Sequence, residues 1–385
     1  MANAFVAHGG GPTAVLNASL WGVVEESRRR GVKQLWAGVG GLAAMPGACT
    51  VDLLDVPTAR IVQMAGQPGS AIGSYRGVIT EDDLERFIEF CRRHDIRYCF
   101  YTGGQGSMAT ARRIVDAARS QSFELMTIGV PKTVDNDLVG TDHCPGFGSA
   151  ARFVAQAVWD IGVDQRALPS PVSIIEVMGR NTGWLAASSV LARYIADAPP
   201  HFIFVPERPF DRESFLGLLD SLLVKRGWVV GVVAEGLRDE AGQMIGAATG
   251  SNRDAKGRPL AGNTAMVLAK LASHRLKVRV RSEKPGLLCR AASTLRSEVD
   301  AREAYAVGRF AVQAAARGKS NVMVGLRREP SSRYRCSYVL VPLAEAAEHE
   351  RALEPIYLNG DSVSDSFREY AAPLTGAKWK APITF

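Results

Sequence analysis

Leu125-Met-Thr-Ile-Gly-Val-Pro-Lys-Thr-Val-Asp-Asn-Asp137 decides the fold class, because in it a short apolar run leads directly into a loop rich in charge. The same order recurs along the chain: an apolar run, a glycine-rich or polar loop, and then a helical pattern. Such runs, alternating with amphipathic helices, are typical of parallel strands covered on both faces. The sequence therefore predicts an α/β fold. Besides residues 125–130, the runs expected to be strands are residues 5–7, 98–101, 172–177, 201–205 and 228–234.

The first helical pattern lies between Asn17 and Gly31. Leu20, Val23 and Val24 share one face of that helix, so this face is expected to pack on the sheet. Arginines crowd the last turn, and a glycine is well suited to end a helix. Ligands of parallel sheets bind at the carboxyl ends of the strands, so the loops that follow the apolar runs are expected to carry the function.

The charged loop after residues 125–130 contains two carboxylates, Asp135 and Asp137. If the chain stays extended there, both point to the same side, about 6.6 Å apart along the strand. One carboxylate could then accept a proton from a substrate hydroxyl while the other coordinates a metal. Lys132 adds a point charge suited to phosphate. A solvated acidic turn without function is the alternative interpretation.

Two further loops are rich in glycine: residues 8–17, which begin His-Gly-Gly-Gly-Pro, and residues 102–107, Thr-Gly-Gly-Gln-Gly-Ser. Glycines let the backbone approach a ligand closely, and exposed N–H groups at a helix start can bind phosphate. Each loop taken alone could equally be a tight turn. Neither is a P-loop, since the chain contains no GxxxxGK[ST] motif.

A fourth loop, residues 176–184, follows another apolar run and reads Glu-Val-Met-Gly-Arg-Asn-Thr-Gly-Trp. Gly179 and Gly183 permit close approach of a ligand, and Arg180 can bind a phosphate with two hydrogen bonds. The alternative is an arginine that bonds only nearby backbone carbonyls.

Two other patterns carry less weight. Residues 146–151 fit the dinucleotide fingerprint G-x-G-x-x-A, but the residues before them form a loop where that motif needs a strand. A nicotinamide cofactor is therefore not expected. The alternation Lys277-Val-Arg-Val-Arg281 puts three cations on one face of a strand, either an edge strand defended by charge or one wall of a phosphate pocket.

Composition excludes several classes of protein. The chain has 385 residues, 46% hydrophobic and 22% charged, which fits a globular protein of about two domains. No apolar stretch is long enough for a transmembrane helix, and the N-terminus lacks the features of a signal peptide. The six cysteines form no CxxC pair, so reduced thiols and a cytoplasmic location are expected.

The net charge of +7, from 46 basic and 39 acidic residues, suits an anionic partner. A phosphorylated metabolite is favoured over nucleic acid, because the basic residues are dispersed and aromatic residues are not interleaved with them. No membrane partner is expected.

Taken in order, these loops resemble the phosphofructokinase family, and within it the pyrophosphate-using branch. The matching pieces extend over essentially the whole chain, and the most specific are PKTVDND and EVMGR; the others include GGGPTAVLNASL, YTGGQGSMATA, TDHCPGFGSAAR and VVAEG. The resemblance implies two Rossmann-like three-layer α/β lobes with mostly parallel sheets. Residues 1–146 with part of 289–385 would form the phosphoryl-donor lobe and residues 147–288 the acceptor lobe, in a homodimer or homotetramer.

The resemblance also implies roles for the matching residues. Asp135 resembles the general base that takes the proton from the 1-hydroxyl of fructose 6-phosphate, with Thr133 and Arg76 beside it in the catalytic set. Asp137 matches a residue that binds substrate and Mg²⁺. The implied donor-binding residues are Gly10, Gly11, Arg76, Gly104, Gln105, Gly106, Ser107 and Lys132. The implied substrate-binding residues are Thr133, Asp135, Asp137, Met178, Gly179, Arg180, Glu235 and Arg290.

The chain departs from the family at three points. Gln105 stands where relatives place a motif with a carboxylate, so it offers the metal only a neutral, weaker ligand. Gly106 is the residue of ATP-using relatives, whereas Lys132 is the residue of pyrophosphate users. Cys289 precedes Arg290 where many relatives carry glutamine. We favour pyrophosphate as donor; ATP, a different sugar or polyol acceptor, and a catalytically weak regulatory paralogue are the alternatives that the sequence leaves open.

Overall fold

The computed structural model describes residues 1–42, 50–168, 170–247, 253, 257 and 260–383. These residues form two compact units, each built from two separate segments. The first unit comprises Met1–Phe147 and Glu298–Arg351, and the second comprises Gly148–Ser297 and Ala352–Phe385. The sequence prediction ends the first segment of the donor lobe at residue 146 and assigns residues 147–288 to the second lobe. The second unit of the structure also contains residues 289–297 and 352–385.

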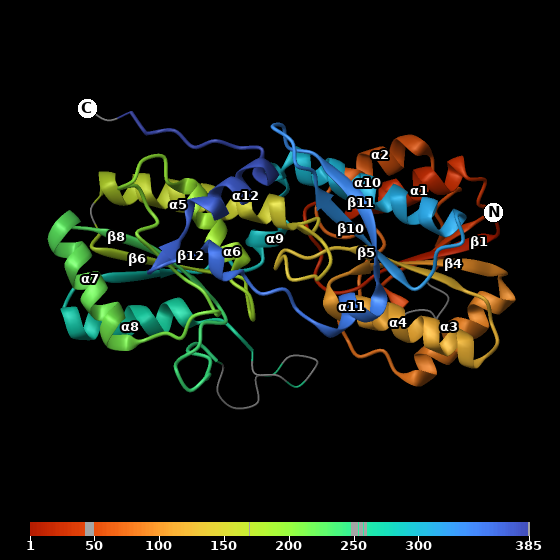
Figure 1. Cartoon of the computed structure of the whole chain (residues 1–385), viewed down its shortest axis with the longest axis horizontal. Coiled ribbons are helices and arrows are strands. Elements are labelled where there is room, and N and C mark those ends of the chain that lie inside the picture. Colours follow the sequence, from red (N-terminus) through yellow and green to blue (C-terminus); the bar gives the residue numbers. More distant parts are fainter. Residues whose placement is uncertain (43–49, 169, 248–252, 254–256, 258–259, 384–385) are drawn as a thin grey trace. The chain divides into compact units, whose positions relative to one another are not determined.

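The first unit is built on a seven-stranded sheet with the strand order β11-β10-β5-β4-β1-β2-β3 (Figure 1). The β2–β3 and β10–β11 pairs are antiparallel and the other neighbours are parallel. The strands are β1 (Asn3–His8), β2 (Leu35–Gly38), β3 (Thr50–Asp52), β4 (Ile96–Gly103), β5 (Met126–Pro131), β10 (Val322–Arg328) and β11 (Cys336–Pro342).

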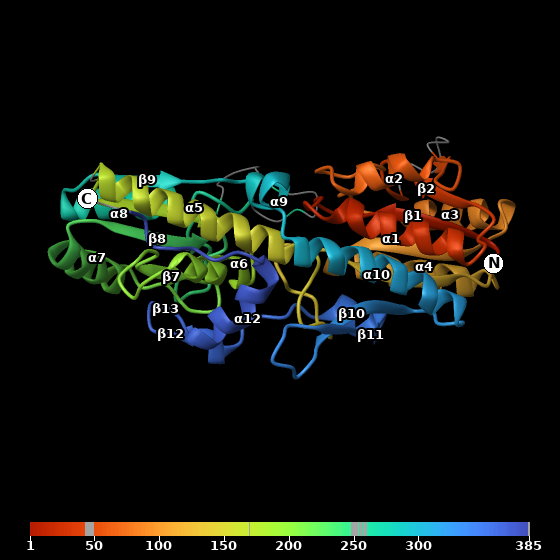
Figure 2. The same cartoon turned by 90° about the horizontal axis from the view of Figure 1, so that it is seen from above.

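Helices cover both faces of this sheet, as Figures 1 and 2 show. On one face lie α1 (Leu16–Arg29), α2 (Thr58–Ala65) and α10 (Glu298–Ala316); on the other lie α3 (Glu81–Arg93), α4 (Gln105–Ser120) and α11 (Leu343–Glu348). Leu20, Val23 and Val24 of α1 are buried in one core, together with Val307 and Ala311 of α10. The apolar face predicted for the first helix is therefore the face that packs.

The second unit contains a four-stranded, all-parallel sheet with the order β7-β8-β6-β9. Its strands are β6 (Val172–Val177), β7 (Phe202–Phe204), β8 (Val229–Ala234) and β9 (Val280–Glu283). Figure 1 shows α7 and α8 on one face and α5 on the other. The helices are α5 (Phe147–Ala167), α6 (Trp184–Ser188), α7 (Arg212–Arg226), α8 (Thr264–Leu276), α9 (Leu288–Ala291) and α12 (Asp365–Thr375), with the 3-10 turns η2 (Ser189–Ala192), η3 (Ser293–Leu295) and η4 (Pro355–Tyr357) and the hairpin β12 (Leu358–Asn359) and β13 (Ser362–Val363).

The six apolar runs of the sequence correspond to β1, β4, β5, β6, β7 and β8, so the predicted α/β class with mostly parallel sheets is confirmed. The prediction that a strand begins at Lys277 is wrong. Lys277 is the C-terminal cap of α8 in the left-handed conformation (φ 56°), so it does not share a strand face with Arg279 and Arg281. The strand begins at Val280 and lies at the edge of its sheet.

Three smaller expectations concern the whole chain. Cys91, Cys99, Cys144, Cys289 and Cys336 are free thiols, while Cys49 lies outside the described residues. Residues 141–145 form a loop, so a strand does not precede the dinucleotide-like glycines. In the described part of the chain, none of the helices combines the length and the apolar character needed to cross a membrane.

Candidate functional site

The first glycine loop follows β1 and is fixed to two neighbouring segments. The N–H of Gly9 donates to the Thr102 carbonyl of β4 over 2.8 Å. The N–H of Gly10 donates to the Tyr75 carbonyl, also over 2.8 Å. The second bond brings the exposed Arg76, the next residue, to the same end of the sheet. A predicted donor-site arginine thus lies beside a predicted donor-site loop.

The second glycine loop joins β4 to α4 and needs its small residues. A Cβ atom on Gly103 would lie 2.0 Å from Ser107 Oγ, and one on Gly9 would lie 2.4 Å from the same atom. Helix α4 begins at Gln105, has no acidic residue in its first turn, and has no side-chain cap among the described residues. Its first N–H groups and the positive end of its dipole therefore suit an anion.

Lys132 contacts both loops, since its backbone N–H donates to the Gly103 carbonyl of the second loop over 3.0 Å. Its side chain is buried, and Nζ donates to the Gly9 carbonyl over 2.9 Å and to the Gly11 carbonyl over 2.7 Å. The sequence analysis predicted that the Lys132 ammonium binds phosphate. In the structure this ammonium also holds the first glycine loop in place through its two hydrogen bonds. Burial and then the Lys132 charge lower the pKa of His8 to about 3. The histidine is therefore neutral, and Lys132 is the positively charged side chain of this pair.

Asp135 and Asp137 lie on a turn, and the extended geometry considered for them is wrong. Strand β5 ends at Pro131, and Asn136 between the two aspartates has a positive φ of 57°. The N–H of Asp135 donates to Thr133 Oγ1 over 3.0 Å. Asparagine tolerates the left-handed conformation better than most residues, so the sequence Asp-Asn-Asp folds into a turn here. We refer to Thr133–Asp137 as the carboxylate turn.

The surroundings of Asp137 disfavour the charged form of its carboxyl group. Burial, followed by the negative charges of Asp135 and Glu350, raises its pKa to about 7. Its Oδ1 atom is buried and is among the side-chain atoms without a hydrogen-bond partner in the described structure. A carboxylate oxygen in such a position is suited to a cation.

Glu350 is a neighbour of the carboxylate turn that sequence analysis missed. Residues Leu138 and Glu350 form an antiparallel bridge, and the N–H of Arg351 donates to the Asp137 carbonyl over 2.7 Å. The segment after α11 thereby returns to the end of β5. A pairing between residues so distant in sequence has no local signal, so only the fold reveals it.

Gln105 is tied to the same returning segment. Its amide nitrogen donates to the Ala347 carbonyl of α11 over 2.8 Å. This hydrogen bond uses the side-chain nitrogen of Gln105. The predicted weak contact with the metal would be made by the other polar atom of the side chain, its carbonyl oxygen. The Gly106 residue that follows is exposed.

In the second unit, the predicted substrate residues follow β6 and β8. The N–H of Glu235 donates to the Val177 carbonyl over 2.9 Å, and the N–H of Gly236 donates to the Gly179 carbonyl over 3.1 Å. Gly179 has φ 137°, and a Cβ there would lie 2.6 Å from the Thr182 carbonyl. The tight packing of these two loops requires glycine and brings Met178, Gly179 and Arg180 beside Glu235.

Arg290 lies in α9 next to the buried Cys289, whose thiol lies near the backbone of Met178. This contact brings α9 to the loop after β6. Burial, and then the charge of the nearby Glu176, raises the pKa of Glu235. Glu235 therefore takes up a proton more readily than an ordinary glutamate, and in that form it can donate as well as accept hydrogen bonds.

The predicted site residues thus form two groups, one in each unit. The first, at the ends of β1, β4 and β5, contains Gly10, Gly11, Arg76, Gly104, Gln105, Gly106, Ser107, Lys132, Thr133, Asp135 and Asp137. The second, at the ends of β6 and β8 and on α9, contains Met178, Gly179, Arg180, Glu235 and Arg290.

Parallel sheets with glycine loops, an uncapped helix start and a carboxylate turn at their strand ends define a class of α/β proteins suited to phosphate chemistry. Within that class the chain belongs to the phosphofructokinase family, whose family model, described as Phosphofructokinase, matches residues 3–315.

Similarity to individual proteins extends over the whole chain. The pyrophosphate–fructose 6-phosphate 1-phosphotransferase of Xanthomonas campestris pv. campestris is 38% identical over 396 residues, which cover 100% of this chain and 93% of that protein. A sulfofructose kinase of Alkalicoccus urumqiensis is 31% identical, covering 92% of this chain and 91% of that protein. The crystal structure of the pyrophosphate-dependent phosphofructokinase of Marinobacter aquaeolei matches with a TM-score of 0.88 at 34% identity, over 100% of this chain and 94% of that chain.

Proposed function

We propose that this chain is a phosphotransferase that moves a phosphoryl group from pyrophosphate to the 1-hydroxyl of fructose 6-phosphate or a similar sugar phosphate. The observation that carries the proposal is the meeting of the carboxylate turn, Lys132 and the start of α4 at adjacent strand ends. The names of the relatives in Xanthomonas and Marinobacter support the same reaction.

Phosphoryl transfer depends mainly on positioning and on neutralising charge, and the first unit offers both. Lys132 and the N–H groups of the α4 start would bind the donor phosphates, with Arg76 beside them. Asp135 would accept the proton of the sugar hydroxyl as that oxygen attacks the transferred phosphorus, the bridging P–O bond of pyrophosphate breaks and inorganic phosphate leaves. The side chain of Thr133, which accepts a hydrogen bond from the Asp135 N–H, would hold this carboxylate in place.

Mg²⁺ is the metal that we propose for the reaction, and Asp137 fits it, because its buried Oδ1 lacks a hydrogen-bond partner in the described structure. In proteins this ion usually keeps several waters and binds one or two carboxylates together with substrate phosphates. When bound, it supplies positive charge to the phosphate oxygens. Asp137 would be its main protein ligand, with the carbonyl oxygen of Gln105 as a weaker one.

The second unit would bind the acceptor. Arg180 and Arg290 are suited to the phosphate group of the sugar, while Met178, Gly179 and Glu235 would contact its hydroxyls. We therefore propose the first unit as the donor unit and the second as the acceptor unit. Assembly into a homodimer or homotetramer stays a prediction, for which light scattering of the purified protein is the measurement.

Phosphorus NMR of the purified protein tests the proposed function. Parallel samples would contain Mg²⁺ and fructose 6-phosphate with either pyrophosphate or ATP. We expect a sugar bisphosphate signal with pyrophosphate, because a buried lysine at the glycine loop favours a compact, highly charged donor. Product only with ATP would overturn the proposed donor.

The acceptor is tested in the same way. The relative named sulfofructose kinase makes a sulfonated fructose the first alternative to include, followed by other sugar phosphates and polyols. Phosphorylation of one of these in preference to fructose 6-phosphate would change the acceptor and leave the rest of the proposal intact. The absence of product with every donor and acceptor would favour the regulatory paralogue.

A further inference from the structure

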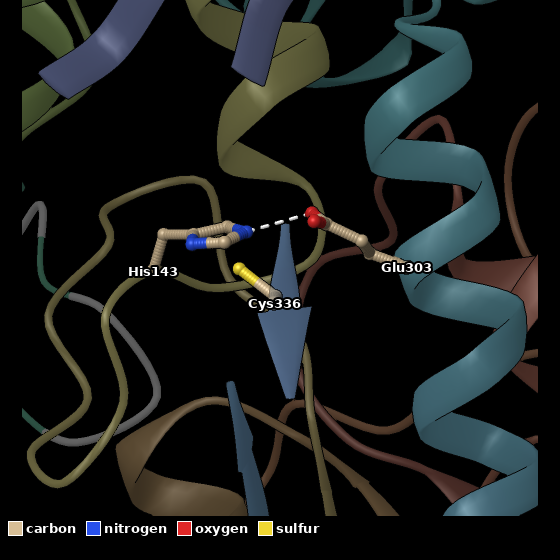
Figure 3. A group of neighbouring side chains, drawn as sticks. All are labelled: His143, Glu303 and Cys336. Carbon is tan, nitrogen blue, oxygen red and sulfur yellow. Dashed lines mark hydrogen bonds and ion pairs between the residues drawn. The ribbon is translucent and has the colours of Figure 1, made fainter. Parts of the chain in front are cut away.

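His143 lies in the loop that follows the carboxylate turn, and both of its ring nitrogens face carboxylates. Nδ1 is 2.8 Å from Oδ2 of Asp142, and Nε2 is 2.7 Å from Oε2 of Glu303 on α10. Figure 3 shows the ring of His143 directed at Glu303, with Cys336 of β11 beside it. The side chain of His143 is almost fully buried, with 2% of its surface exposed.

This geometry requires a cationic ring. A neutral imidazole carries one N–H, so its second nitrogen would set a lone pair against a carboxylate oxygen; only the imidazolium donates to both. Burial alone would lower the pKa of His143, but the hydrogen bonds and charges of Asp142 and Glu303 outweigh it and raise the pKa to about 9. The charge balance and the geometry therefore agree.

The groups around the ring complete the network. On one side, Arg328 of β10 donates to Oδ2 of Asp142 over 3.1 Å. On the other side, the Tyr334 hydroxyl donates to Oε1 of Glu303 over 2.6 Å and lies 3.2 Å from Nε2 of His143. The loop residue, α10 and the β10–β11 hairpin are thus held together through one buried cation.

The cluster does not favour a metal, although among the described residues His143, Glu303 and Cys336 are the one group of three with ligand atoms within 4.8 Å of one another. In the cationic ring, the Nε2 nitrogen that would bind the ion carries a proton and donates it to Glu303, 2.7 Å away. The Tyr334 hydroxyl also lies between the ligands, 3.2 Å from Nε2 and 3.2 Å from the Cys336 sulfur. A metal would have to displace both.

The loop that His143 belongs to supports the carboxylate turn directly. The N–H of Cys144 donates to Oδ1 of Asn136, which lies between the two proposed functional aspartates, over 2.9 Å. The N–H of Thr133 donates to the Pro145 carbonyl over 3.2 Å. We refer to residues 141–146 as the support loop, because it contacts the turn at both of these residues.

A second acid of α10 anchors the other end of the support loop. The N–H of Gly146 donates to Oδ1 of Asp300 over 2.8 Å, and this carboxylate is 2% exposed. Asp300 and Glu303 are three residues apart, so they share one face of the helix. Helix α10 therefore holds the support loop at His143 and at Gly146.

We propose that cationic His143 is a positioning residue for phosphoryl transfer: by pairing with Glu303 it fixes the support loop to α10, and the loop in turn fixes Asn136 and the two aspartates. The transfer step itself rests on the proposed function. His143 acts through the support loop, so its removal would change the geometry of the reacting groups and leave their chemistry unaltered.

The variants His143→Gln and Glu303→Gln test the pairing. Each keeps a side chain that can form one of the hydrogen bonds and removes one charge. We expect kcat to fall about 10- to 100-fold in His143→Gln while KM for both substrates changes little, because misplacement of reacting groups costs about this much. In the double variant the losses should be far from multiplicative, since both changes remove one interaction. His274→Gln, on the exposed surface of α8, is the matched control and should leave kcat unchanged.

The pH profile separates positioning from general destabilisation. The pKa of His143 lies near 9 in the folded protein, above the ordinary 6.5. The protonated ring therefore contributes fully to the stability of the folded state below pH 6.5, and this contribution is lost as the pH rises through about 9. Wild-type kcat should therefore fall near pH 9, and this fall should move to lower pH in Glu303→Gln. An unchanged alkaline profile in that variant would overturn the proposal.

Two measurements need no turnover and so distinguish this proposal from the proposed function. Ring nitrogen-15 NMR of histidine should show His143 protonated at both nitrogens at pH 7; a neutral ring, or stoichiometric binding of added Zn²⁺ to it, would overturn the proposal. Hydrogen exchange of the Cys144 and Gly146 amides should accelerate in His143→Gln. Unchanged exchange in a folded variant would also contradict it, whatever the enzyme does with pyrophosphate.

Discussion

Asp135 is the residue on which the proposed chemistry depends most. Asp135→Asn keeps the shape of the turn and removes the proton acceptor, so kcat should fall about 100- to 10,000-fold while KM for fructose 6-phosphate stays similar. The control is Asp116→Asn, at an exposed position on α4, which should not change turnover. Steady-state kinetics with pyrophosphate would check this, and full activity in Asp135→Asn would remove the assigned base.

Asp137 should show the opposite effects on activity and stability. Its half-buried carboxylate lies near Asp135 and Glu350, which repel it. Asp137→Asn removes that repulsion, so the melting temperature without metal should rise by a few degrees. The same change should lower kcat at least about 100-fold, because the proposed metal ligand is lost. A variant that is both less stable and equally active would contradict the role of Asp137. Calorimetry and kinetics on one preparation give both values.

At the residue scale, sequence reasoning singles out candidate residues where a local motif marks them. Lys132, Asp135 and Asp137 could be singled out because three charges lie at the end of one apolar run. The conformation of the turn was not predictable in the same way, because the left-handed Asn136 depends on the bond that its side chain accepts from the support loop. Glu350 was missed because its pairing with Leu138 is long-range.

At the scale of elements, the start of α4 carries Gln105, the residue predicted to be a weak ligand of the metal. Gln105→Asp would place a carboxylate in the first turn of the helix, where the dipole favours it. We expect the Mg²⁺ concentration for half-maximal activity to fall about 10-fold, because a carboxylate is a stronger ligand than an amide.

The matched control for that change is Gln105→Ala. It also loses the hydrogen bond to Ala347 but adds no carboxylate, so its Mg²⁺ requirement should rise or stay the same. Activity measured against Mg²⁺ concentration for the three proteins separates the two effects. An equal shift in both variants would mean that the bond to α11, and not the charge, sets the metal requirement.

The elements themselves were predicted unevenly. The six buried parallel strands were found because a short, nearly continuous apolar run bounded by turn residues is typical of a strand covered on both faces. Strands β10 and β11 were not, because they join the sheet as an antiparallel hairpin beside β5, and β11 is largely half-buried, so its apolar signal is weaker. The start of β9 was misplaced because the last turn of α8 and its cap continue the basic pattern.

At the scale of the whole molecule, the first unit depends on two distant segments of chain. Residues 1–147 alone lack β10, β11 and α10. Val307, Ala311 and Val312 of α10 cover the core formed by α1 and the sheet. We expect the isolated fragment 1–147 to expose this apolar face and to aggregate or remain unfolded, without a cooperative thermal transition.

A fusion of residues 1–147 to residues 298–351 through a short glycine-serine linker is the control. The junction is short, because the N–H of Gly146 already donates to Asp300 over 2.8 Å. The fusion should unfold cooperatively, as followed by circular dichroism. A fragment 1–147 that folds equally well by itself would show that the second segment is dispensable.

The way the two units share the chain also fixes an order of events on the ribosome. The four strands β6 to β9 all lie between residues 148 and 297, so this sheet can close as soon as that stretch has emerged. The seven-stranded sheet must wait for β10 and β11, although its strands β1 to β5 precede the second unit in the chain. During synthesis the sheet that begins second is therefore complete first, and the N-terminal strands must be kept from aggregating in the meantime.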